Sequence, residues 1–136
     1  MERTNKHFRK RDAILNCVRS TDAHPSADWV FEHVKEQVPD ISLATVYRNL
    51  ALFKDQGLIT SLGTVKGVER FDGNTDPHVH FICHGCGGVN DLHQLEVPTA
   101  LARTAADLSQ AEVEGCQLTF TGLCRNCKNE KLEEAI

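Results

Sequence analysis

The chain has 136 residues, of which 40% are hydrophobic and 25% are charged, with a formal net charge of −4. This length and composition are those of a globular protein with one ordinary domain or two small ones. No apolar run is long enough for a signal peptide or a membrane span, which excludes a membrane partner and predicts a cytoplasmic location. In that reducing compartment, six cysteines are better explained as metal ligands or redox sensors than as a disulfide framework.

The charge is distributed unevenly along the chain. Residues 1–70 contain 11 Lys and Arg against 9 Asp and Glu, whereas residues 71–136 contain 4 against 10. A basic first half and an acidic second half indicate two modules with different partners. The basic residues at the start of the chain are either part of a solvated, disordered tail or contacts to nucleic acid, and the candidates for such contacts are Lys6, Arg9, Lys10 and Arg11.

Three helices are predicted in the first half. The first lies near residues 11–20, where apolar residues have helical spacing at Ile14, Leu15 and Val18. The second is predicted to begin after an N-cap at Ser26 and to continue to Pro39. Its buried stripe consists of Ala27, Val30, Phe31, Val34 and Val38. The third begins after Ser42 and ends at Gly57, with an inner face of Leu43, Val46, Leu50 and Phe53.

Two short strands are predicted next, at residues 58–62 and 68–71, separated by a glycine-bounded turn at 63–67. Three helices followed by a β-hairpin is the element order of a winged helix-turn-helix. Side chains able to read a major groove lie away from the apolar stripe of the third helix, namely Thr45, Arg48 and Asn49, with Tyr47 at the flank of the stripe. An ordinary exposed helix face is the alternative interpretation.

The composition changes after Phe71. Residues 72–77 are rich in turn-forming residues and are predicted as a hinge between a DNA-binding domain, residues 1–71, and a second domain, residues 78–136. Further elements are predicted as strands at 78–83 and 87–95, a helix at 98–109, a strand at 113–124 and a polar tail. The second domain has few large apolar residues, so it is expected to need a metal or a partner subunit for stability. The predicted fold class is α+β, a winged helix-turn-helix followed by a small α/β domain.

Four of the cysteines form two C-x-x-C pairs, Cys83 with Cys86 and Cys124 with Cys127, separated by 37 residues. Four thiolates around one ion make a closed tetrahedral site, which favours structural Zn²⁺. Two separate redox pairs and a rubredoxin-like iron site are the alternatives. An enzyme is not expected, because zinc deaminases need an H-x-E glutamate and an open coordination position that this chain lacks.

Histidines and aspartates outside the cysteine pairs form a second candidate group. His78 and His80 are two residues apart on a predicted strand, so they share a face, and Asp91 on the next strand can lie opposite them. An exposed histidine pair is the alternative. Taken singly, His24 before a helix cap and Asp72 in a turn are more often structural than functional.

Five motifs, in order, resemble the ferric uptake regulator family of bacterial metal-dependent repressors. They are AHPSA (23–27), SLATVYRNL (42–50), RFD (70–72), HVHFICHGCGGVND (78–91) and the second C-x-x-C pair. The resemblance implies a homodimer that binds double-stranded DNA, at an AT-rich inverted repeat, through the winged helix. It also implies that the C-terminal α/β module is a dimerisation domain with a structural zinc held by the four cysteines.

The family's regulatory metal site corresponds by motif to His24, Asp72, His78, His80 and Asp91. Three imidazoles and two carboxylates suit Fe²⁺ or Mn²⁺. Aspartate at both acidic positions is similar to the peroxide-sensing members of the family, whereas iron-uptake repressors typically have glutamate. The resemblance then implies that peroxide and Fe²⁺ oxidise His24 or His78 to 2-oxo-histidine and release DNA. A repressor responding to iron or another metal is the alternative, and a zinc-stabilised interaction module is an alternative of another class.

Overall fold

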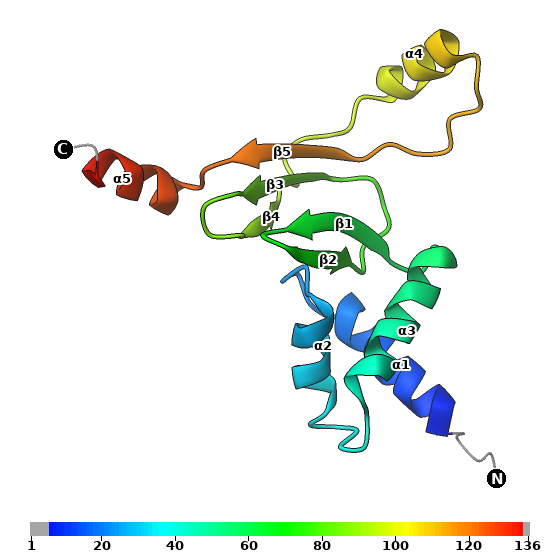
Figure 1. The fold of residues 1–136 in the computed structure, drawn as a ribbon. Helices are drawn as coiled ribbons and strands as arrows, with labels where there is room; N and C mark the ends of the chain where they lie inside the picture. Colours follow the sequence, from blue (N-terminus) through cyan, green and yellow to red (C-terminus); the bar gives the residue numbers. More distant parts are fainter. Residues whose placement is uncertain (1–5, 135–136) are drawn as a thin grey trace. The chain divides into compact units, whose positions relative to one another are not determined.

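The computed structural model describes residues 6–134, and the chain divides into two compact units with their boundary between Thr75 and Asp76. This boundary lies within the segment 72–77 that was predicted as a hinge. Both units combine helices with strands (Figure 1), which confirms the α+β class. Within the described residues, no helix has the length and apolar character needed to cross a membrane.

The first unit contains three helices followed by a β-hairpin, the predicted order. Its elements are α1 (Lys6–Arg19), α2 (Ala27–Val34), α3 (Leu43–Asp55), β1 (Thr60–Val65) and β2 (Val68–Asp72). Helix α1 begins at Lys6, so a disordered basic tail is the wrong interpretation for residues 6–11. The predicted N-caps are confirmed: the Ser26 hydroxyl accepts from the backbone N–H of Trp29 at 3.2 Å, and that of Ser42 accepts from Thr45 at 3.1 Å.

Helix α2 is shorter than the sequence pattern predicted. It ends at Val34 rather than continuing to Pro39, and a turn follows in which the N–H groups of Gln37 and Val38 both donate to the Val34 carbonyl. Proline disfavours helical geometry in the residue before it, here Val38, so the helix does not continue to Pro39. Val38 is nevertheless buried, because the turn returns its side chain to the core.

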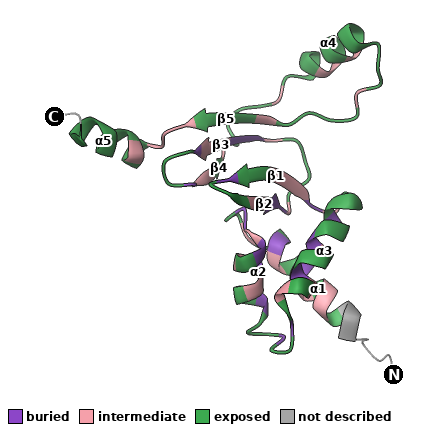
Figure 2. Cartoon of the chain, in the orientation of Figure 1, coloured by how far each residue is buried: buried purple, intermediate pink, exposed green. Residues whose placement is uncertain are grey.

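The three helices and the hairpin share one hydrophobic core. Its buried side chains are Ile14, Leu15, Val18, Ala27, Val30, Val34, Val38, Ile41, Val46, Leu50, Phe53, Ile59 and Phe71. Figure 2 shows how strongly burial concentrates in this unit. The hairpin is antiparallel with a bulge between Ser61 and Gly63. The turn itself is only Lys66–Gly67, both with positive φ (52° and 81°), because a two-residue hairpin turn of this hand requires left-handed backbone at both positions.

The second unit is built on a three-stranded sheet in the order β4–β3–β5. Its elements are β3 (Val79–Cys83), β4 (Val89–Asp91), α4 (Thr99–Ser109), β5 (Leu118–Gly122) and α5 (Arg125–Glu134). Strand β4 is antiparallel to β3, whereas β5 is parallel to it, with α4 in the connection. The strands are shorter than predicted, and the expected polar tail is wrong for 125–134, which form helix α5.

Candidate metal sites and DNA-contacting residues

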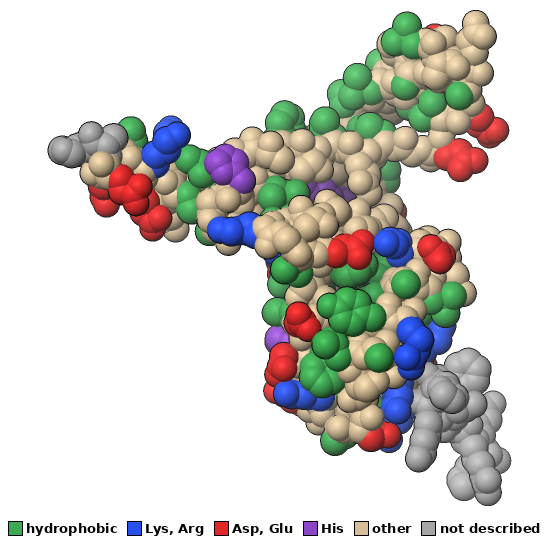
Figure 3. Space-filling view, viewed as in Figure 1, with side chains coloured by type: hydrophobic (Ala, Val, Ile, Leu, Met, Phe, Trp, Pro, Cys, Tyr) green, Lys and Arg blue, Asp and Glu red, His purple; other side chains and the backbone are tan. Residues whose placement is uncertain are grey.

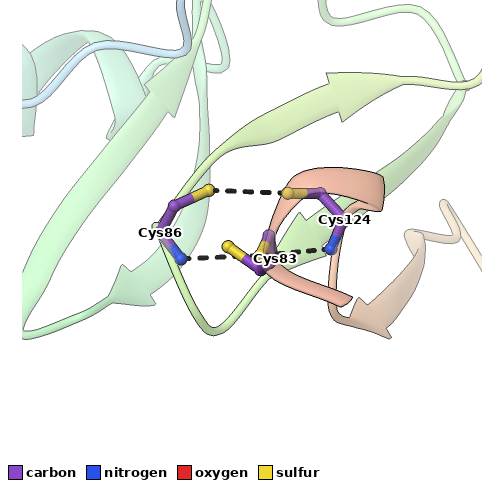
Figure 4. Close-up of side chains that lie close together, drawn as sticks. Cys83, Cys86 and Cys124 are labelled. Carbon is purple, nitrogen blue, oxygen red and sulfur yellow. Dashed lines mark hydrogen bonds between the residues drawn. The ribbon is translucent and has the colours of Figure 1, made fainter. Parts of the chain in front are cut away.

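The four predicted zinc ligands lie together in the second unit. Cys83 ends β3, Cys86 follows in the turn, Cys124 comes after β5, and Cys127 lies in the first turn of α5. Their sulfur atoms are all within 4.8 Å of one another. Figure 4 shows the Cys86 and Cys124 sulfurs pointing toward each other, 3.9 Å apart. This group, called the cysteine cluster below, has the donor atoms and spacing to hold one metal ion.

The backbone around the cysteine cluster is shaped to receive anionic sulfur. The N–H groups of Cys124 and Cys86 donate to the Cys83 sulfur at 3.3 Å and 3.5 Å. A side chain at Gly85 would place its Cβ 3.0 Å from the Cys127 sulfur, so any larger residue there would have to displace this cysteine. Gly87 adopts a left-handed φ of 75° in the same turn.

The thiols of the cysteine cluster affect one another's ionisation. Donation from the Cys124 and Cys86 backbone N–H groups lowers the pKa of Cys83 to about 6. Hydrogen bonding to the neighbouring thiols of Cys124 and Cys83 raises the pKa of Cys127 to about 12. Four thiolates this close repel one another, so a divalent cation is needed to hold all four in the ionised form. The cluster therefore fits a Cys₄ metal ion.

In the first unit, His24 and Asp72 form a buried pair. Their side chains are 2% and 7% exposed, and His24 Nε2 lies 3.6 Å from Asp72 Oδ2. The other carboxylate oxygen of Asp72 accepts from the backbone N–H of Asn74 at 2.9 Å. His24 lies in the turn between α1 and α2 and has a φ of 51°, which is uncommon for a residue other than glycine.

In the second unit, His78, His80 and Asp91 form a triad. The strand register pairs His80 with Asp91, as predicted. The Nε2 atoms of both histidines lie 3.3 Å from the same oxygen, Asp91 Oδ1. His78 precedes β3 rather than belonging to it, and its Nδ1 lies 2.6 Å from the carbonyl oxygen of Asp76. Since a carbonyl only accepts, Nδ1 is the donor in this contact, which leaves Nε2 as the ring nitrogen that faces Asp91 and would bind a metal.

Sequence reasoning missed three residues that lie against these groups. His93 Nε2 lies 3.8 Å from the second oxygen of Asp91, and its spacing of two residues from Asp91 is a signal that could have found it. Asp76 contributes through its backbone carbonyl, and Arg70 donates to backbone carbonyls of Ala23 and His24. A contact to a backbone oxygen does not require a particular residue type at the acceptor position. The roles of Asp76 and Arg70 could therefore not be identified from the sequence.

The α3 residues predicted to contact DNA differ in their exposure to solvent. On α3, Tyr47 and Arg48 are exposed, whereas Thr45 and Asn49 are half-buried. Asn49 donates from Nδ2 to the Thr45 carbonyl at 2.9 Å, and Arg48 donates to the Thr45 hydroxyl at 3.1 Å. Tyr47 and Arg48 are therefore the better placed of the four for contact with a base edge.

The basic residues of α1 are held against the first unit. Arg9 donates to the Gln37 carbonyl at 3.2 Å, Lys10 pairs with Asp40 at 3.6 Å, and Arg11 lies over the Phe53 ring. The Lys6 side chain lies outside the described residues. Figure 3 shows Lys and Arg side chains on the first unit, interspersed with acidic side chains, and further acidic side chains near α5. These basic side chains belong to the unit with the helix-turn-helix order.

Comparison with known proteins finds relatives of this chain both by sequence and by structure. The model of the ferric uptake regulator family matches residues 2–121. The peroxide-responsive repressor PerR of Staphylococcus epidermidis is 37% identical over 123 residues, covering 89% of this chain and 80% of the relative. The Campylobacter jejuni peroxide stress regulator has a TM-score of 0.78 at 26% identity, covering 90% of this chain and 91% of that one. The Francisella tularensis ferric uptake regulator, solved with iron, has a TM-score of 0.71 at 26% identity, covering 93% and 95%.

Proposed function

Because this chain belongs to the ferric uptake regulator family, whose members are dimeric DNA-binding regulators rather than enzymes, we propose that it is a metal-dependent repressor that senses hydrogen peroxide. The observation that carries the proposal is the ligand chemistry of the two groups outside the cysteine cluster. Both consist of imidazole and aspartate alone, and neither offers a thiolate. Such donors suit Fe²⁺ or Mn²⁺.

One regulatory ion takes ligands from both groups in this proposal. The pair His24 and Asp72 and the triad His78, His80 and Asp91 each provide too few donors for Fe²⁺ or Mn²⁺ at their usual coordination numbers. Together they supply five. An ion bound to all five would link the DNA-binding unit to the second unit. Metal binding and DNA binding would then be coupled and reciprocal, because the ion would select one orientation of the recognition helices.

The cysteine cluster has a different role in the proposal. Four thiolates form a closed set that leaves no position for a substrate, so the ion they hold is Zn²⁺ with a structural function. The soft sulfur ligands retain zinc, whereas the N/O ligands exchange the signalling metal. The second unit is proposed to form the homodimer, and Tyr47 and Arg48 on α3 to contact an AT-rich inverted repeat.

Peroxide sensing follows from the side chains that surround the regulatory ion. Fe²⁺ held by these residues would activate hydrogen peroxide next to the imidazoles, and the imidazole would be the group that is oxidised. One oxygen atom of the peroxide is transferred to the ring carbon between the two nitrogens of His24 or His78, and the other leaves as water. The product, 2-oxo-histidine, carries a hydrogen on both ring nitrogens, so it has no lone pair for the metal. Loss of that ligand breaks the link between the units and releases DNA.

A gel-shift experiment on an AT-rich inverted repeat tests this function. We expect Mn²⁺ and Fe²⁺ each to support binding, and a low dose of peroxide to abolish binding only in the Fe²⁺ sample. Mass spectrometry should then find one added oxygen on a peptide containing His24 or His78. Omission of metal and a scrambled DNA duplex are the controls.

Three other outcomes contradict the proposal in different ways. Binding that survives peroxide in Fe²⁺ indicates an iron-responsive repressor, which the iron-bound Francisella structure also makes a candidate. Oxidised cysteines and lost zinc, with unmodified histidines, indicate a thiol-based sensor. No DNA binding with either metal indicates a zinc-stabilised interaction module.

A further inference from the structure

The turn that carries His24 is held by hydrogen bonds to strand β2. Three consecutive carbonyl oxygens of this turn, called the His24 turn (residues 23–25), accept hydrogen bonds from two adjacent residues of β2. Arg70 donates from its terminal nitrogen to Ala23 at 2.9 Å and from Nε to His24. The backbone N–H of Phe71 donates to Pro25 at 2.9 Å.

Arg70 lies on the same strand as Asp72, the metal-ligand candidate of β2. Successive side chains of a strand point to opposite faces, so Arg70 and Asp72 share a face of β2. Asp72 reaches the His24 ring at 3.6 Å, while Arg70 reaches the His24 backbone. One strand therefore supplies one proposed ligand and holds the main chain of the other.

The conformation of His24 explains why such restraint is needed. Its φ of 51° costs free energy for a residue with a side chain, so the turn relaxes unless its surroundings hold it. Arginine suits the task, because its planar guanidinium presents several N–H donors in a rigid fork. Lysine has a single rotating ammonium and cannot reproduce the same two bonds with this geometry.

We propose that Arg70 is a positioning residue for the regulatory metal, which keeps the His24 turn in the conformation that presents the imidazole beside Asp72. The inference rests on the proposed function, since it requires His24 to be a ligand. Loss of the two hydrogen bonds frees the turn, and the affinity for metal falls although no ligand has been removed. Outer-shell partners of metal ligands have effects of about 10-fold to 100-fold on metal affinity.

A double-mutant cycle with Mn²⁺ tests the role of Arg70, because Mn²⁺ avoids oxidation. Mn²⁺ affinity is measured by competition titration for the wild type, His24→Ala, Arg70→Met and the double variant, with zinc content and circular dichroism recorded for each. Methionine keeps much of the apolar stem and removes the donors. We expect Arg70→Met to weaken Mn²⁺ binding by about 10-fold, and the double variant to bind no more weakly than His24→Ala, since Arg70 acts through His24.

Two further variants complete the design. Arg19→Met is the matched control, because Arg19 also donates to a backbone carbonyl of the first unit, that of Leu58, at 3.5 Å, but not to the His24 turn. Its Mn²⁺ affinity should equal that of the wild type. Arg70→Lys keeps the charge and should lose affinity to an intermediate extent; it also provides the test if Arg70→Met does not fold.

The outcomes separate the two proposals. If His24→Ala weakens Mn²⁺ binding but Arg70→Met and Arg70→Lys do not, the positioning role is wrong and the five-ligand site stands. Additive losses in the double variant also overturn the positioning role, because Arg70 would then act independently of His24. If His24→Ala leaves Mn²⁺ affinity unchanged, the proposal of a five-ligand site is wrong, and the proposed role of Arg70 is then wrong as well.

Discussion

Gly73, the residue after Asp72, lies against the end of α1 with no space for a side chain. A Cβ atom there would be 2.6 Å from the Arg19 Cα and 2.7 Å from the Val18 carbonyl oxygen. These are backbone atoms of a packed helix, so the chain at 72–74 would have to move instead. Because Asp72 is adjacent, the movement would displace a proposed metal ligand.

Gly73→Ala should therefore impair both stability and metal binding. We expect the free energy of unfolding to fall by about 1–3 kcal/mol, as for other overpacked positions, and Mn²⁺ affinity to fall with it. Urea titration followed by the fluorescence of Trp29, the single tryptophan, measures the first effect. Gly115→Ala is the control, since a Cβ there meets nothing within 4 Å. Equal behaviour of the two variants would contradict the steric argument.

At the residue scale, the ligand candidates were predictable because metal chemistry selects few residue types at narrow spacings. The C-x-x-C pairs and the pairing of Asp91 opposite His80 could be inferred from the sequence. The supporting residues could not. Gly73 and Arg70 act through backbone atoms of segments distant in sequence, and only the folded chain brings those segments together.

At the scale of single elements, the N-terminus of α3 connects helix stability to DNA recognition. The Ser42 hydroxyl accepts from the Thr45 backbone N–H and lies 2.9 Å from the Thr45 hydroxyl. Arg48 donates to that same Thr45 hydroxyl at 3.1 Å. The cap is therefore the start of a chain of hydrogen bonds that leads to a residue proposed to contact a base.

Ser42→Ala should destabilise the first unit and weaken DNA binding. Losing an N-cap hydroxyl costs about 1 kcal/mol of stability, and the freed Thr45 hydroxyl leaves Arg48 less restrained. Operator affinity at saturating Mn²⁺ and unfolding by urea are the two measurements. Ser26→Ala removes the equivalent bond of α2, to Trp29, and should lower stability similarly with a smaller effect on DNA. Equal losses of DNA affinity would show that Ser42 acts through stability alone.

Elements were predictable where an apolar stripe and a cap occur together, as in α2 and α3. Helix α5 was missed because its sequence, RNCKNEKLEE, has no such stripe and none of its described residues is buried. Instead it begins at the second cysteine pair, where the Lys128 N–H donates to the Cys124 carbonyl at 2.8 Å. Here the geometry of the cysteine cluster, rather than burial of a helix face, determines where the helix starts.

At the scale of the whole molecule, the two units differ in what stabilises them. The first has a continuous core of buried side chains from all three helices and the hairpin. In the second, Val79 and Cys83 are the buried hydrophobic residues among those described, and Leu101, Leu108, Phe120 and Leu132 are exposed. The sequence-based expectation of a thin second domain agrees with this difference. A covering partner could not be located from the sequence, because exposed apolar residues do not specify what packs on them.

Loss of the cysteine-cluster metal should therefore unfold the second unit and spare the first. A structural zinc contributes on the order of 10 kcal/mol to small domains, more than two buried hydrophobic side chains can replace. Removing the ion with a chelator, or replacing a ligand by Cys124→Ser, should leave the urea midpoint reported by Trp29 nearly unchanged, since Trp29 lies in α2. Amide hydrogen exchange of β3 and β5 should meanwhile become fast. Cys116→Ser, an exposed cysteine outside the cluster, is the control and should alter neither readout. Simultaneous loss of both units on chelation would show that they fold as one cooperative block, because the core of the first unit would then be insufficient by itself.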